Sequence, residues 1–452
     1  MEIHPEIFKP YDIRGIYPDQ INEKVAFEIG RAFVQFLKRK KRKKPEIIVG
    51  RDNRISSPSL AKGLKQGIKT QSAQIIDIGL STTPMLYFGV NLLNADGGVM
   101  VSASHNPAEY NGFKLTREKA IPISGKSGIQ EIKKIILQKS FKRSSSKGQE
   151  KKKSIVREYI RFNLSFLDQL KLSPLKIVID TANAVSGILI KPLEKKIKKI
   201  KIYHLFWKLD GRFPHHQPDP LKKENLKPLQ KEVLKRKADL GVAFDGDGDR
   251  IIFVDEKGKI ISGDLITALL ARIILKKNPN EKILYDIRSS DVVKETIEEN
   301  RGIPVESRIG HSFIKEKMRK ENIAFGGELS GHYYLRENDF CETPFFVLFK
   351  IMEEISVQNK PLSKIVSPFK RYVSSGEINF KIKDKQKAME RFENYFKNKA
   401  LKISHLDGVK LRFKDHWILL RPSNTEPLLR LVIEAKNRKI LNEKIKEVRK
   451  LI

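Results

Sequence analysis

Apolar and polar positions along the chain form two kinds of segment that recur in a fixed order. In the first kind, an apolar run ends in polar residues, at 45–54, 175–184 and 281–290. In the second kind, a short apolar run breaks into a loop rich in glycine or serine, at 97–107, 238–250 and 321–332. Sequence with helical periodicity lies between or after these segments. The order predicts three α/β units of related plan.

Interruptions of this pattern indicate where the units end. Residues 139–153 form a polar, low-complexity stretch, which is typical of a linker. The pattern breaks again near 254–264 and at 363–377, where a proline and a Ser-Ser-Gly sequence occur. Residues 408–435 contain two strand-like stretches joined by a polar loop, with helical sequence on either side, as expected of a small α+β domain. We therefore expect four domains, at residues 1–148, 149–256, 257–369 and 370–452.

The composition excludes several classes of protein. The apolar stretch at 265–275 is far shorter than the roughly 20 residues that a membrane helix needs, and the first fifteen residues contain no apolar core of a signal peptide. Cys341 is the only cysteine, so an intramolecular disulfide and a four-cysteine zinc site are both excluded. We expect a soluble protein in a reducing compartment, the cytoplasm, without a membrane partner.

The formal net charge of +35 raises the hypothesis of a nucleic-acid-binding protein, because lysine and arginine surfaces attract phosphate backbones. The basic runs at 38–44, 142–153 and 195–201 are scattered and lack stacking aromatic residues or a known nucleic-acid motif. Charge runs are mainly surface features. We interpret these runs as solvated loops and faces whose field favours anionic substrates, and nucleic-acid binding is disfavoured. The sequence does not determine the oligomeric state.

Three carboxylates close together form the first candidate site. In "DGDGDR", Asp245, Asp247 and Asp249 alternate with glycines, which let the backbone curl so that the side chains converge. Converging carboxylates repel one another unless a cation is present, and oxygen ligands favour Mg²⁺ or Ca²⁺. An EF-hand is the rival interpretation. Arg250, however, stands where that loop requires glycine, and the flanking sequences resemble strands instead of helices.

The second candidate is the serine in "VSASHNPAEYNGFKL". Taken alone, Ser104 is compatible with a Ser-Asn-Pro turn in which the polar side chains bond local backbone. Ligands in open α/β sheets bind beyond the carboxyl ends of the strands, so we expect the serine loop and the acidic loop to share one site. A phosphate on Ser104 would then supply both an oxygen ligand to the ion and a transferable group. Lys114 is close enough in sequence to join them.

Two further loops offer groups for a polyhydroxylated, phosphorylated ligand. "GELSGH" places Glu328, Ser330 and His332 at alternate positions, and the carboxylate can accept from two neighbouring hydroxyls. "RPSNTEP" combines a guanidinium with hydroxyl, amide and backbone donors, as a phosphate cradle would. Each loop also fits a simple turn, and His311 in "RIGHSF" fits a turn before a helix that Ser312 caps.

Taken together, "SASHNP", "DGDGDR", "GELSGH" and "RPSNTEP" resemble the α-D-phosphohexomutase superfamily, in its phosphomannomutase/phosphoglucomutase branch. "KPYDIRG" at 9–15 and "GHSFIKEKM" at 310–318 also match. The resemblance implies an α/β fold, with three sandwich-like α/β domains containing mixed sheets and a smaller α+β domain around a central cleft. It also implies an enzyme that interconverts hexose 1-phosphate and hexose 6-phosphate through a phosphoserine and a hexose 1,6-bisphosphate.

The resemblance assigns a role to each candidate residue. Ser104 would carry the phosphoryl group and, with the three aspartates, hold Mg²⁺. The other catalytic residues would be Arg14, His105, Lys114, Arg250 and His332, with His332 or Lys114 as the general base. The substrate phosphosugar would contact Arg288, His311, Glu328, Ser330, His332, Arg421, Ser423, Asn424 and Thr425. The family often has lysine at the position of Arg288, so its hydrogen bonding should differ there.

The sugar is the main point on which alternatives stay open. Phosphoglucosamine mutases usually have glutamine at the position of Leu329 and glycine at that of Asn424, which favours mannose and glucose phosphates here. A phosphoglucosamine mutase remains the alternative within the superfamily. A binding protein that has lost catalysis is disfavoured because no motif residue is missing.

Overall fold

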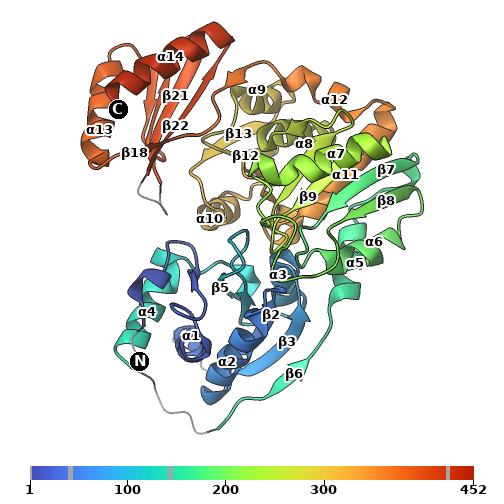
Figure 1. The fold of residues 1–452 in the computed structure, drawn as a ribbon, viewed down its shortest axis with the longest axis vertical. Coiled ribbons are helices and arrows are strands. Elements are labelled where there is room, and N and C mark those ends of the chain that lie inside the picture. Colours follow the sequence, from blue (N-terminus) through green and yellow to red (C-terminus); the bar gives the residue numbers. More distant parts are fainter. Residues whose placement is uncertain (1–2, 39–43, 140, 142–145, 424–427) are drawn as a thin grey trace. The chain divides into compact units, whose positions relative to one another are not determined.

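The computed structural model describes residues 3–38, 44–139, 141, 146–423 and 428–452. Figure 1 shows the helices and strands that these residues form. The chain divides into two compact units. The first consists of Met1–Ile261 with Ser330–Ile365, and the second of Ser262–Leu329 with Val366–Ile452. Among the described residues, none of the helices combines the length and the apolar character required for a membrane crossing.

The first sheet of the first unit is mixed. Its order is β1-β5-β4-β2-β3-β6, in which β4, β2, β3 and β6 run parallel and β5 runs antiparallel to both β1 and β4. The strands are β1 (Ile13–Ile16), β2 (Glu46–Arg51), β3 (Gln74–Leu80), β4 (Gly97–Val101), β5 (Tyr110–Arg117) and β6 (Glu150–Lys152). The helices are α1 (Glu23–Lys38), α2 (Ser57–Thr70), α3 (Thr83–Leu92) and α4 (Gln130–Leu137).

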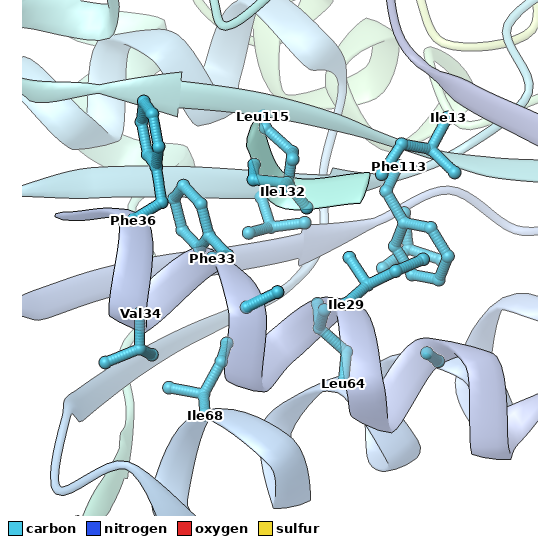
Figure 2. Packing of buried hydrophobic residues seen from close by; sticks show 14 of the residues in the cluster. Ile13, Ile29, Phe33, Val34, Phe36, Leu64, Ile68, Phe113, Leu115 and Ile132 are labelled. Carbon is cyan, nitrogen blue, oxygen red and sulfur yellow. The ribbon is translucent and has the colours of Figure 1, made fainter. Parts of the chain in front are cut away.

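An apolar core lies between this sheet and its helices. Figure 2 shows Ile29 and Phe33 of α1 facing Phe113 and Leu115 of β5, and all four belong to one buried cluster. The helices α1 and α2 pack closely because the contact carries glycine. A Cβ on Gly67 would lie 2.0 Å from the carbonyl oxygen of Phe27. A larger side chain there would force the helices apart.

The second sheet of the same unit repeats the plan. Its order is β11-β10-β9-β7-β8, with β9, β7 and β8 parallel and β10 antiparallel to β9. The strands are β7 (Leu175–Asp180), β8 (Ile200–Leu205), β9 (Leu240–Phe244), β10 (Ile251–Asp255) and β11 (Ile260–Ile261). The helices are α5 (Val156–Leu164), α6 (Gly187–Glu194) and α7 (Lys227–Arg236). The later part of the unit contains β15 (Tyr333–Leu335), β16 (Cys341–Glu342), α11 (Pro344–Gln358) and α12 (Leu362–Ile365).

The second unit contains parallel strands and an antiparallel sheet. Strands β12 (Lys282–Asp286), β13 (Ile303–Ser307) and β14 (Phe325–Gly327) are parallel, and the helices around them are α8 (Gly263–Lys277), α9 (Asp291–Glu299) and α10 (His311–Glu321). The carboxyl-terminal sheet has the order β17-β22-β21-β20-β19, and β18 also pairs with β22. Its elements are β17 (Val373–Ser374), β18 (Ile378–Lys381), α13 (Lys385–Phe396), β19 (Lys402–Ser404), β20 (Val409–Arg412), β21 (His416–Pro422), β22 (Leu428–Ala435) and α14 (Arg438–Leu451).

These elements confirm the α/β class with mixed sheets and a carboxyl-terminal α+β part. Two local predictions were wrong. Residues 408–435 contain three strands instead of two, because the backbone turns where Phe413 N donates to His416 O over 2.9 Å. Within the predicted linker, polar residues 150–152 form the edge strand β6 beside β3. An edge strand has one solvated side, which tolerates polar sequence.

Candidate functional site

Ser104 lies in the loop between β4 and β5, three residues after β4 ends. The side chain is buried. Its hydroxyl donates to Asp245 Oδ2 over 3.0 Å and lies 3.2 Å from His105 Nδ1. The φ angle of Ser104 is 52°, in the left-handed region that few non-glycine residues adopt. A strained residue of this kind persists only where the surrounding structure holds it in place.

Arg54, which the sequence analysis did not select, holds this loop. The side chain is fully buried, and its Nη2 donates to the carbonyl oxygens of Ser104 (2.8 Å) and Asn106 (2.7 Å). Its Nη1 donates to the carbonyls of Pro107 and Tyr110. The remaining donor, Nε, contacts Asp52 Oδ2 at 3.1 Å. All five N–H donors of the guanidinium are therefore used, four of them on the serine loop. The only sequence signal was a charged residue beyond the strand at 46–51.

The three aspartates converge as the sequence predicts. Their ligand oxygens can all lie within 4.8 Å of one another, and all three residues are buried. Gly248 makes the turn with a φ of 70°, and a Cβ on Gly246 would lie 2.2 Å from the carbonyl oxygen of Ser104. The two glycines thus allow the acidic loop to curl and to approach the serine loop. Strands β9 and β10 flank the loop, which excludes the EF-hand.

The charges in this group depend on one another. Burial, and after it the neighbouring Asp249 and Asp247 carboxylates, raises the pKa of Asp245 well above its usual range. Lys114 Nζ lies 2.7 Å from Asp247 Oδ2 and 2.6 Å from Asp249 Oδ2. Burial alone would lower the pKa of Lys114, but these two carboxylates outweigh it and raise the pKa well above the usual value. Lys114 is therefore a cation in this structure.

The donor set fits a metal ion of the Mg²⁺ type. Among the described residues, Asp247 Oδ1 is buried and has no hydrogen-bond partner. An unsatisfied buried carboxylate oxygen is unfavourable unless a cation or another donor reaches it. With two neighbouring carboxylates and Ser104 Oγ close by, it belongs to an oxygen-only set, which hard cations prefer.

Two arginines and two histidines surround this group. Arg14 Nη1 donates to Asn106 Oδ1 over 2.6 Å from strand β1, which pairs with β5. Arg250 Nε contacts His332 Nε2 at 3.2 Å, and the same histidine nitrogen lies 3.3 Å from Asp249 Oδ1. Burial, followed by the Arg250 and Arg14 cations, lowers the pKa of His105 well below its usual value. His105 is thus a neutral imidazole.

The first unit therefore brings together all six residues that were predicted to be catalytic. Ser330 joins them, since its Oγ lies 3.0 Å from His332 Nδ1. A loop of the second sheet supports the serine loop, because Gln217 Nε2 donates to the carbonyl oxygen of His105 over 2.9 Å. A buried serine, a carboxylate triad and surrounding cations can together hold and transfer a phosphoryl group.

The remaining predicted residues lie in the second unit. Arg288 binds Asp286 through two nitrogens, Nε to Oδ1 (3.1 Å) and Nη2 to Oδ2 (2.8 Å), and its Nη2 lies 4.0 Å from Glu328 Oε2. Glu328 is buried and directly follows β14. The loop predicted for the sugar is divided, because Ser330 and His332 belong to the first unit. Arg288 is held by a planar two-point contact that a lysine could not make.

Arg421 and Ser423 are buried at the end of β21, whereas Asn424 and Thr425 lie outside the described residues. His311 is the first residue of α10. The cap residue of this helix is Gly310, with a φ of 121°, so the alternative in which Ser312 caps the helix is wrong. Glycine adopts this positive φ at position 310 more easily than a residue with a side chain does.

Comparison with known proteins defines the class to which this arrangement belongs. Residues 5–143, 157–258 and 262–372 match the phosphoglucomutase/phosphomannomutase alpha/beta/alpha domains I, II and III, and residues 377–451 match the C-terminal domain. Together these matches cover nearly all of the chain. The chain belongs to the phosphoglucomutase/phosphomannomutase family, as its motifs predicted.

Individual relatives agree with this assignment. The chain is 41% identical to a phosphomannomutase of Methanocaldococcus jannaschii over 99% of this chain and 97% of the relative. It is 39% identical to a phosphomannomutase of Vibrio cholerae over 98% of each chain. A crystal structure of a phosphoglucomutase/phosphomannomutase family protein from Burkholderia thailandensis has a TM-score of 0.91 and 30% identity, covering 100% of this chain and 97% of that one.

Proposed function

We propose that Ser104 is the phosphoryl carrier of this hexose-phosphate mutase, which interconverts the 1-phosphate and 6-phosphate of mannose and of glucose. The observation that carries the proposal is the buried Ser104 hydroxyl, 3.0 Å from Asp245 and beside two further carboxylates. The 36–41% identity to proteins named phosphomannomutases supports the enzyme class and the substrates. Cys341 is buried and is not part of a disulfide, which is compatible with the cytoplasmic location that we also propose.

Asp245, Asp247 and Asp249 would hold Mg²⁺ together with a phosphate on Ser104. When bound, the ion would neutralise charge on the transferring phosphoryl group. In this structure Lys114 pairs with two of these carboxylates. When Mg²⁺ takes them as ligands, the Lys114 ammonium group would turn toward the phosphate. As a cation, Lys114 suits charge stabilisation better than proton abstraction, which leaves His332 as the preferred general base.

The proton must move in both half-reactions. When phosphoserine donates to a sugar hydroxyl, that hydroxyl loses a proton, which we assign to His332. Ser104 must in turn regain a proton, and its Oγ lies 3.2 Å from His105 Nδ1. In that half-reaction the proton lost by the sugar hydroxyl equals the one that Ser104 gains, so none is produced or consumed overall. The lowered pKa of His105 keeps this imidazole neutral, so its Nδ1 can accept the proton of Ser104 in the other half-reaction, when the serine attacks the bisphosphate.

The sugar and its distant phosphate require contacts that serve both orientations of the bisphosphate. Glu328 and Ser330 would bind sugar hydroxyls, with Arg288 and His311 as further contacts. Arg421 and Ser423, with Asn424 and Thr425, would bind the phosphate that is not being transferred. A hexose 1,6-bisphosphate is then both the intermediate and the activator that phosphorylates an empty serine. When the bisphosphate turns around, its hydroxyls and its distant phosphate come to similar positions, so the same residues can bind both orientations.

Coupled assays with mannose 1-phosphate, glucose 1-phosphate and glucosamine 1-phosphate test this function. We expect comparable use of the first two, because a site without a buried partner for the C2 substituent discriminates weakly there. We expect much poorer use of the third, since Leu329 offers no side-chain hydrogen bond to an amino group. A clear preference for glucosamine 1-phosphate would overturn the choice of sugar, and inactivity toward all three would overturn the mutase.

A further inference from the structure

A carboxylate of the second unit lies among three guanidinium groups. Glu377 precedes β18, and its Oε1 is 2.8 Å from Arg430 Nη1. Its Oε2 is 3.3 Å from Arg421 Nη2 and 4.0 Å from Arg288 Nη1. The side chain of Glu377 is 26% exposed, whereas that of Arg421 is 5% exposed. One glutamate therefore reaches all three cations from the more solvated side.

The three cations are close enough to repel one another. Burial, followed by the neighbouring Arg288 cation, lowers the pKa of Arg421, and Arg430 acts in the same direction. Glu377 opposes this effect. Arg288 has a second carboxylate in Asp286, and Asp407 raises the pKa of Arg421 in the same direction as Glu377. Glu377 is the carboxylate that contacts all three of these arginines, in the position that an anionic ligand of the cluster would take.

We propose that Glu377 is an internal competitor of the substrate phosphate at Arg421, and that Arg430 is a further phosphate-binding cation of this site. The proposal rests on the proposed function, which assigns Arg421 to the distant phosphate. A phosphate presents more oxygens and more charge than a carboxylate, so it can displace Glu377 from the guanidinium groups. Phosphate binding must first break the ion pairs between Glu377 and the arginines, and this cost lowers the net affinity of the site for phosphate. A reduced affinity lets the bisphosphate leave this cluster when it turns around.

Calorimetric titration of the full-length Ser104→Ala protein with glucose 1-phosphate and with inorganic phosphate tests the competition without turnover. In that background, Glu377→Gln should tighten binding about three- to tenfold, because a partly exposed ion pair is worth about 1 kcal/mol or somewhat more. Glu299→Gln is the matched control, since Glu299 pairs with Arg371 on the surface of the same unit. That variant should leave the affinity unchanged.

The sign of the change decides the proposal. Unchanged or weaker binding by Glu377→Gln would mean that the carboxylate only orients the arginines, which overturns it. In an Arg421→Met background, Glu377→Gln should no longer tighten binding by the full factor. A gain that persists there in full would reflect net charge alone and would also overturn the proposal. Arg430→Met should weaken binding in the Glu377→Gln protein.

Failure of this inference is distinguishable from failure of the proposed function. If the wild-type protein is an active mutase but Glu377→Gln does not bind phosphate more tightly, only the proposed competition is contradicted. Tighter binding without mutase activity in the wild-type protein would leave the competition standing and contradict the mutase.

Discussion

Replacing Arg54 by methionine separates the role of this residue in folding from its role at Ser104. The side chain is fully buried and donates to four carbonyls of the serine loop, with Asp52 as its counter-ion. Asp52 is itself buried and also accepts from Ser57 and Ser102. Methionine fills much of the space but leaves both the carboxylate and the carbonyls without their cation. Breaking a buried pair in this way costs about 3–5 kcal/mol.

The pH dependence follows from the unpaired Asp52. Burial raises the pKa of Asp52, and the Arg54 cation opposes this rise, so removal of Arg54 should raise the pKa further. A carboxyl group whose pKa is raised in the folded state favours folding at low pH and loses that advantage as pH rises through the folded-state pKa. The stability gap between the wild-type protein and Arg54→Met should therefore narrow as the pH falls from 7 to 5.

Urea denaturation at both pH values, combined with mutase assays, provides the measurement. Asp52→Asn in the Arg54→Met background should restore part of the stability, because it removes the unpaired charge. It should not restore kcat, because the four carbonyls of the serine loop still lack their donor. Arg51→Met is the control, since Arg51 is partly exposed and its Nη1 donates to the carbonyl oxygen of Asp52 instead of to its carboxylate, and we expect a change below about 1 kcal/mol. Recovery of full kcat in the double variant would refute a positioning role for Arg54.

Three further changes test other parts of the structure. Asp247→Asn should leave the fold intact and lower turnover about 10²- to 10³-fold; undiminished activity at limiting Mg²⁺ would exclude the three-carboxylate site. Mass spectrometry should find an ~80 Da phosphoryl group on dephosphorylated wild-type protein after treatment with glucose 1,6-bisphosphate, and equal labelling of Ser104→Ala would mean that another residue is the carrier. Burial raises the pKa of Glu434 to about 7, so its ionisation should destabilise the fold as pH rises from about 5 to 8. Glu434→Gln should flatten that slope in thermal unfolding, and an unchanged slope would show that another group titrates.

Local sequence patterns predict the parts of the site that depend on local backbone. The glycines of the acidic loop predict its curl, and the structure has that curl between β9 and β10, with a φ of 70° at Gly248. The adjacent Ser104 loop follows from the apolar run that becomes β4. Residues close together in the chain determine these features. The spacing of apolar positions indicates the strand, and the glycines indicate where the backbone can turn sharply.

Partners that are distant in sequence were not predictable in the same way. Arg54 reaches Ser104 across 50 residues, and Glu377 reaches Arg421 across 44. In both cases the sequence shows only a charged residue near a strand, in a chain with 143 charged residues of four types among 452. Lys and Glu side chains are usually solvated, so composition favours the surface for any one of them. Only the fold distinguishes the few that become buried partners.

The same contrast explains why the net charge of +35 carries little information about the site. At the site, two buried cations are neutralised locally by carboxylates, Arg54 by Asp52 and Lys114 by Asp247 and Asp249. The lysines at 195, 196, 198 and 199 are exposed instead. A charge that is removed from water is unfavourable unless an opposite charge lies close to it. Charges in water are screened over about 10 Å, so unpaired lysines on the surface have little effect on stability. The surface charge can vary without changing the site, so the fold and the buried pairs carry the information about chemistry, and the overall charge does not.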